Sequence, residues 1–122
     1  MSSLIAMNIN NLGEGQPDRP AADRLIEGDP RFTSWPLLDG NFATGIWAAT
    51  PGHHRVIRDQ ATTEAFLILE GEIELSEDGT PAPRRFGAGD LVVFPPGFTG
   101  SWRTLSSVRK MYCTVQDAGG AR

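Results

Sequence analysis

Three polar side chains in a short segment of the chain, Arg58, Gln60 and Glu64, have the chemistry to recognise or transform a small molecule. The planar guanidinium of Arg58 suits bidentate recognition of a carboxylate or ureido group. Gln60 can both donate and accept hydrogen bonds, which suits an amide or ureide ligand. Glu64 would act as a general acid or base if partial burial raised its pKa. This set predicts a site for a small polar or anionic metabolite, with Glu64 as the candidate catalytic residue.

A purely structural interpretation of the same residues stays open. Arg58 and Glu64 would form a buried ion pair without catalytic meaning if they only contacted each other. The positive charge of Arg58 would then also oppose any rise in the pKa of Glu64. The sequence alone does not decide between ligand binding and fold support.

The elements that position these residues are predicted to be β-strands. After Pro30, short apolar runs alternate with Gly and Pro, which is typical of an all-β sandwich or barrel. Asp78-Gly79 separates two such runs and predicts a hairpin turn. The expected strands lie near 31–37, 42–50, 53–60, 64–70, 72–75, 82–86, 91–94, 100–105 and 108–115.

The two ends of the chain have a different character from the middle. Residues 1–30 are rich in Gly, Pro, Asp and Arg, and are predicted to form an arm or loop that packs on the barrel or on a partner, with at most a helical turn over 21–27. Residues 31–116 are predicted to form the barrel, and residues 117–122 a flexible tail. One domain is expected, because a chain of 122 residues has room for a single core.

Charge and composition exclude several classes of function. The net charge is −4 and the eleven basic residues are scattered, so no basic stripe is present to bind nucleic acid. The start of the chain lacks the features of a secretory signal, and no run approaches a membrane span. With Cys113 as the only cysteine, an intramolecular disulfide is impossible. We therefore expect a cytoplasmic protein with neither nucleic acid nor a membrane as partner.

The apolar run from Leu91 to Phe94 points to a partner of another kind. Successive side chains of a strand face opposite sides, so an unbroken apolar run needs cover on both sides. One side would face the barrel lumen, and a second copy of the chain would cover the other. This run and the long N-terminal arm predict a homodimer.

Two segments match spacings that mark a known superfamily. In the first, Gly52 is followed at fixed intervals by Arg58, Gln60, Glu64 and Gly71. This order resembles the first cupin motif, G-x5-H-x-H-x3-E-x6-G.

The second segment runs from Gly89 through Pro95 and Gly97, and resembles the second cupin motif, G-x5-P-x-G-x2-H-x3-N, with Gly100 at the histidine position and Thr104 at the asparagine position. From about Thr33 to Val115 the chain resembles small single-domain cupins related to the cupin domain of ureidoglycine aminohydrolase. The resemblance implies an RmlC-like cupin jelly-roll barrel, also called a double-stranded β-helix, carrying an N-terminal arm.

The residues at the metal-ligand positions depart from the family pattern. Metal-binding cupins generally use three histidines and one glutamate, but Arg58, Gln60 and Gly100 stand where the imidazoles would be, and only Glu64 remains. We therefore expect no metal cofactor, with a guanidinium at the floor of the barrel in its place.

A weakly bound divalent ion such as Mn, Mg or Zn is the alternative, held by His54, Gln60 and Glu64. His53 and His54 are adjacent on an expected strand, so at most one of them reaches the lumen. Both are interpreted most simply as residues on the solvent side of that strand.

Aromatic residues are expected to line the pocket. Trp102 has the same strand parity as Gly100, a lumen-facing position in metal cupins, and should therefore point inward. Lys110 shares parity with Tyr112 and would either reach the pocket or extend outward to solvent. The alternative is that the aromatic rings are plain core. The predicted substrate-binding residues are Arg58, Gln60, Trp47, Phe66, Trp102, Lys110 and Tyr112.

These residues support two hypotheses and leave open whether the protein is an enzyme. The first is a metal-free enzyme, such as a lyase, isomerase or amidohydrolase-like protein, acting on a small carboxylate, sugar or ureide. Its metal-dependent variant would use the His54, Gln60 and Glu64 site. The second is a sensor or accessory module that binds a metabolite without chemistry.

Overall fold

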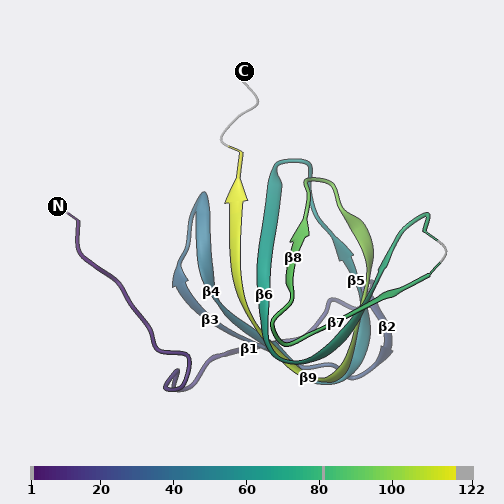
Figure 1. Ribbon diagram of the computed structural model, residues 1–122, viewed down its shortest axis with the longest axis horizontal. Coiled ribbons are helices and arrows are strands. Elements are labelled where there is room, and N and C mark those ends of the chain that lie inside the picture. The colour runs from purple at the N-terminus through teal and green to yellow at the C-terminus, as the bar shows by residue number, and fades with distance from the viewer. Residues whose placement is uncertain (1, 81, 118–122) are drawn as a thin grey trace.

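The chain forms a strongly curled antiparallel sheet, and the described residues contain no helix (Figure 1). The computed structural model describes residues 2–80 and 82–117. Its strands are β1 (Gln16–Asp18), β2 (Leu25–Gly28), β3 (Phe32–Leu38), β4 (Phe42–Ala49), β5 (Gly52–Ile57), β6 (Thr62–Glu77), β7 (Arg84–Gly87), β8 (Leu91–Phe94) and β9 (Thr99–Gln116). The all-β fold class predicted from the sequence is confirmed.

Two long strands, β6 and β9, hold the two layers of the fold together. They pair with each other along most of their length. The first half of β6 and the second half of β9 share a layer with β8, β4, β3 and β1. The second half of β6 and the first half of β9 share the other layer with β7, β5 and β2. Because both strands continue from one layer into the other, the sheet curls over on itself and encloses a core.

A break in register lets β6 keep apolar side chains inward in both layers. Before the break, Phe66 and Ile68 are buried; after it, Ile73 and Leu75 are buried, so the inward positions change from even to odd numbers. The pairing with β9 shifts between Ile68 and Ile73, where the extra residue of a β-bulge restores the inward direction. Gly71 lies within this bulge.

Replacing Gly71 with alanine is expected to lower the free energy of unfolding by about 2 kcal/mol. Gly71 has φ +90°, and a Cβ atom there would collide with the carbonyl oxygen of Ser107. Gly79, at the hairpin after β6, provides the matched control because its φ is +86° but its Cβ would meet open space. Urea unfolding of Gly79→Ala should show about half that loss, and equal losses in the two variants would contradict a close approach at Gly71.

The core lies between the two layers and is rich in aromatic rings. Phe66, Phe94 and Trp102 are almost fully buried, and their ring centroids lie 5.2 to 6.4 Å apart. Phe98 stacks on Phe94 at 4.4 Å. The buried residues of β9 are Gly100, Trp102, Thr104, Val108 and Lys110, all at even-numbered positions, and Trp102 points inward as the parity argument predicted.

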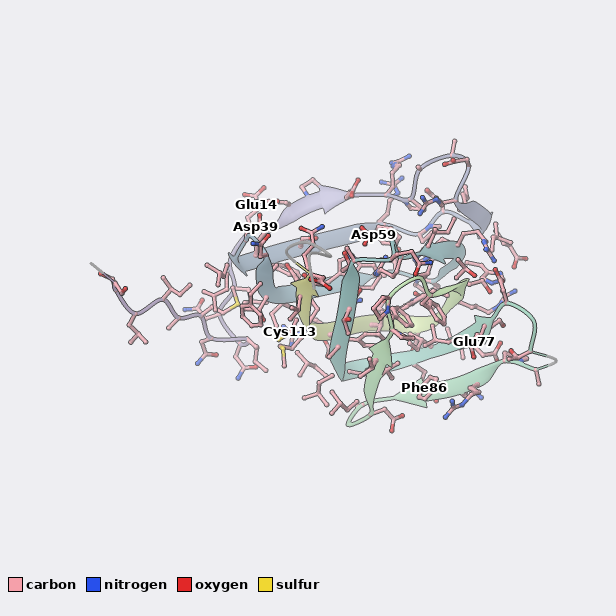
Figure 2. All side chains as sticks on the ribbon, turned by 90° about the horizontal axis from the view of Figure 1, so that it is seen from above. Glu14, Asp39, Asp59, Glu77, Phe86 and Cys113 are labelled. Carbon is pink, nitrogen blue, oxygen red and sulfur yellow. The ribbon has the colours of Figure 1, made fainter. Side chains whose placement is uncertain are left out.

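Residues 1–30 contain more regular structure than the expected arm or loop. β1 pairs with β3 and β2 pairs with β5, so both strands add to the edges of the sheet. The helical turn expected over 21–27 is limited to one turn after Ala21, and the chain enters β2 at Leu25. The N-terminal end of the described chain extends away from the body (Figure 2). Of the tail expected at 117–122, all but Asp117 lies outside the described residues.

The outer face of β8 is open in the single chain. Leu91 and Val93 are 70% and 55% exposed, whereas Phe94 is buried on the other face of the same strand. The homodimer expected to cover this face therefore stays a prediction. In the part of the chain that the structure describes, no helix is long and apolar enough to cross a membrane.

Candidate functional site

A cavity of about 530 Å³ opens between the two layers, on the side covered by the segment that links β1 to β2. Its lining combines aromatic rings with charged groups, and includes Asp18, Arg19, Asp23, Arg24, Phe32, Trp47, His54, Arg55, Arg58, Glu64, Trp102, Lys110, Tyr112 and Thr114. A mostly preformed hollow with a few convergent polar groups is the usual form of a small-molecule site.

Glu64 lies at the centre of the polar part of this cavity, between two cations. Only 3% of Glu64 is exposed. Its Oε1 accepts hydrogen bonds from Nε of Arg58 at 3.0 Å and from Nη2 of the same guanidinium. Its Oε2 accepts a hydrogen bond from Nζ of Lys110 at 2.7 Å. The three side chains therefore carry one net positive charge.

Lys110 is the only lysine of the chain and is almost completely buried, with 5% exposed. Its ammonium lies over three rings, 4.4 Å from the centroid of Phe66 and 4.7 Å from those of Trp47 and Trp102. Aromatic faces attract cations, and Glu64 supplies the counter-charge. This arrangement holds a cation in the interior, in contrast to the alternative that Lys110 extends outward to solvent.

Arg58 is positioned by the end of β5. The strand stops at Ile57, and the amide of Arg58 then donates to the carbonyl of Phe98 at 2.8 Å. The side chain is 30% exposed, and its guanidinium carbon lies 5.6 Å from the ring centroid of Phe94. Because Nε and Nη2 engage Glu64, Nη1 has no hydrogen-bond partner among residues 2–80 and 82–117.

The cations keep Glu64 ionised. Burial alone would raise the pKa of this carboxyl, but the attraction of Lys110 and then of Arg58 outweighs burial and holds the pKa below its ordinary value. Burial lowers the pKa of Lys110, and the contact with Glu64 opposes that change. A carboxylate whose two oxygens already accept from cations is a weak base and a poor general acid.

His54 forms another part of the cavity wall, contrary to the expectation that it lies on the solvent side. Alternation along β5 turns His54 and Val56 inward and leaves His53 outside, where its Nδ1 lies 3.0 Å from Nη2 of Arg103. Burial, followed by the charge of Lys110, lowers the pKa of His54 to about 4. The imidazole is therefore neutral at neutral pH.

The structure brings most of the predicted site residues together. Arg58, Glu64, Trp47, Trp102, Lys110 and Tyr112 line the cavity. Phe66 is fully buried behind it, in contact with Lys110. Gln60 is exposed, packs on the turn at Gly97 and is absent from the cavity lining. Its position differs from expectation because the chain has already left the strand at Ile57, so strand parity no longer applies at Gln60.

Sequence reasoning missed one contributor to the cavity, the link between β1 and β2, and placed His54 in the lumen only in the metal-binding alternative. The link between β1 and β2 brings Arg19 and Arg24 to the rim, but a segment rich in Gly, Pro and Asp carries no signal of where it packs. His54 could have been found from its parity with Val56, the apolar residue that faces the core on the same strand.

The residues at the family's metal-ligand positions do not fit a divalent metal. Glu64 is the only acid there, and both of its oxygens accept from cationic side chains. A metal ion on this carboxylate would lie against Arg58 and Lys110 and be repelled by both. Gln60 does not line the cavity and cannot complete the alternative site with His54. Within residues 2–80 and 82–117, no three His, Cys, Asp or Glu side chains form a metal-binding group.

Comparisons with known proteins identify the fold. The DUF861 family protein of unknown function from Pseudomonas syringae pv. tomato is 24% identical, with a TM-score of 0.73 over 85% of this chain and 45% of that one. The Clostridium difficile EutQ protein is 16% identical, with a TM-score of 0.63 over 84% and 82% of the two chains. The Cnp3 cupin domain of Schizosaccharomyces pombe is 21% identical, with a TM-score of 0.60 over 70% and 65%.

These likenesses confirm the predicted cupin jelly-roll architecture and extend no further than the fold. The chain spans less than half the length of the Pseudomonas protein. No curated protein sequence matches it. The model of the EutQ-like cupin domain family matches residues 37–112, which is more than half of the chain. The chain therefore belongs to the EutQ-like cupin domain family.

Proposed function

We propose that the cavity binds a small metabolite through a carboxylate group, without a metal, by ion pairing with Arg58 and Lys110. The observation that carries this proposal is the charge of the polar cluster: two cations share the single carboxylate of Glu64. A net positive charge in a partly desolvated hollow is compensated best by an anion.

One nitrogen of the Arg58 guanidinium is available to donate a hydrogen bond to the carboxylate of the ligand. Nη1 of its guanidinium remains available while Nε and Nη2 contact Glu64. Lys110 lies on the other side of Glu64, so an incoming carboxylate is attracted by both cations while Glu64 keeps them apart. Trp47 and Trp102 offer apolar surface to the rest of the ligand.

Binding is favoured over proton transfer by Glu64. Its pKa lies below the ordinary value and both oxygens are occupied, so the acid and base roles considered from the sequence receive no support. Of the ligand classes considered, carboxylates fit the charge of the site better than neutral sugars. The resemblance to the ureidoglycine aminohydrolase cupin domain adds ureides that carry a carboxylate to this proposed class.

Replacing Arg58 with methionine is expected to weaken the binding of propionate or lactate by about 10- to 100-fold, because one charged hydrogen-bond donor is lost. Methionine keeps an unbranched side chain while removing the charge. Titration of the acid into the protein, monitored by nuclear magnetic resonance, measures the affinity of each variant. The control is Arg85→Met, because Arg85 on β7 forms an exposed ion pair with Glu72 on β6. Equal affinities for wild type and Arg58→Met would contradict the proposal.

A further inference from the structure

The imidazole of His54 is buried in the cavity wall without a hydrogen-bond partner. Only 8% of the residue is exposed, and Nδ1 is sealed from solvent. In the described part of the chain, neither ring nitrogen forms a hydrogen bond. The adjacent His53, on the outer face of the same strand, has a partner in Arg103. The unpaired group is therefore the one that faces the cavity.

The surroundings of His54 do not explain why a polar ring occupies this position. Its ring centroid lies 4.9 Å from Phe32, 6.1 Å from Trp102 and 6.5 Å from Trp47. An apolar ring would pack against these neighbours equally well and would leave no buried nitrogen unpaired. Nε2 of the same ring also lacks a partner among the described residues but is not sealed, so it is the nitrogen that a ligand in the cavity can pair with.

His54 lies close to the proposed carboxylate anchor. Trp47 and Trp102 contact both groups: each ring lies 4.7 Å from Nζ of Lys110 and within 6.5 Å of the imidazole of His54. A ligand of a few carbon atoms held by the cations at one end therefore reaches His54 with another group. Since Nδ1 is sealed, Nε2 is the ring nitrogen available to it.

We propose that His54 determines specificity by forming a hydrogen bond, through Nε2, to a hydroxyl or amide group on the carboxylate ligand. This inference rests on the proposed function and narrows its ligand class to hydroxy acids and amido acids. Because the ring is neutral at neutral pH, it has hydrogen-bonding capacity but no charge to attract a second anion.

Two pairs of acids, each matched in shape, test the inference. Lactate differs from propionate by one hydroxyl group. N-acetylglycine has nearly the shape of 4-methylpentanoate but carries an amide further from the carboxylate. In at least one pair, the wild-type protein is expected to bind the polar acid about tenfold more tightly, in titrations followed by nuclear magnetic resonance.

Two variants show whether His54 causes the preference. His54→Phe keeps an aromatic ring and should reduce the ratio of the two affinities from about tenfold to about one. His54→Gln can still form hydrogen bonds and should retain part of the preference. His54→Phe should also raise Tm at pH 7, because it removes a buried nitrogen without a partner. A purely structural histidine would lower Tm when replaced.

The outcomes separate the two proposals. If the wild-type protein binds both members of each pair equally, or if His54→Phe keeps the preference, the role of His54 is overturned while carboxylate binding stands. If none of the four acids binds at tens of millimolar, the proposed function fails and the role of His54 fails with it. The wild-type ratio alone tests the inference should a variant not fold.

Discussion

Replacing Glu64 with glutamine is expected to lower the free energy of unfolding by about 3–5 kcal/mol, because Lys110 is left as a buried cation without a counter-charge. Glutamine has nearly the volume of glutamate, so the loss reports charge and not packing. Lys110 is 5% exposed, and its ammonium lies against three aromatic rings that supply no counter-charge. Urea unfolding at pH 7 with linear extrapolation measures the difference.

Two further variants make this prediction specific. Glu77→Gln is the matched control, because Glu77 lies at the far end of the same strand, where it is exposed (Figure 2). It should change the free energy of unfolding by no more than about 0.5 kcal/mol. Combining Glu64→Gln with Lys110→Met removes both charges and should recover much of the loss. A loss in Glu64→Gln as small as that of the control would contradict a buried ion pair.

Acidification from pH 7 to pH 4.5 is expected to lower the free energy of unfolding by about 2–3 kcal/mol through His54 alone. The pKa of His54 falls from 6.5 to about 4 in the folded protein, because of burial and then the nearby charges of Lys110, His53 and Arg58. Below pH 6.5 the unfolded chain therefore binds a proton that the folded protein does not. The contribution of His54 to the free energy of unfolding is fully present above pH 6.5 and is lost as pH falls toward 4.

Comparison with His54→Phe isolates this contribution. Burial also lowers the pKa of His53, and the lowered pKa of Glu64 adds a loss of stability as pH falls below 4.5, the ordinary value for a glutamate. Both groups are present in the variant, so they cancel in the difference between the two proteins. Urea unfolding at pH 7, 6, 5 and 4.5 should show a shallower loss for His54→Phe. Identical losses would mean that His54 is solvated in the folded state.

The main features of the fold could be predicted from the sequence, because strand and turn signals are local. The segment 91–94 was predicted at its observed bounds, and the turn at Asp78-Gly79 joins β6 to β7 as expected. β6 and β9 were each expected as two strands, since Gly71 and the serines near 106 suggest breaks. The chain continues through these points by a bulge, which depends on pairing with another strand.

β1 and β2 carried no signal of their own. Both are short and have no buried residue, so they lack the alternation of apolar and polar residues that marks a strand. Their structure comes from pairing with β3 and β5 at the sheet edges, a property of the assembled fold.

The site could be predicted in part for a related reason. The spacing of the first cupin motif indicates Arg58 and Glu64 as site residues, and the two side chains do form a contact. Strand parity predicts that Trp102 points inward, and it is buried. Parity alone could not decide whether Lys110 pointed in or out, because its ion pair and ring contacts come from other strands. Gln60 was misplaced for the opposite reason: the motif spacing continues through it, but the strand does not.

In the proposed function, side-chain cations and not a metal ion hold the ligand. The most direct test measures the affinity for lactate in chelator-treated protein, with and without added Mn or Zn. The titration is monitored by nuclear magnetic resonance. We expect the same affinity in all conditions, and a loss of about 10- to 100-fold in Arg58→Met. Binding that appears only when the metal is added, and that is unchanged in Arg58→Met, would contradict the account.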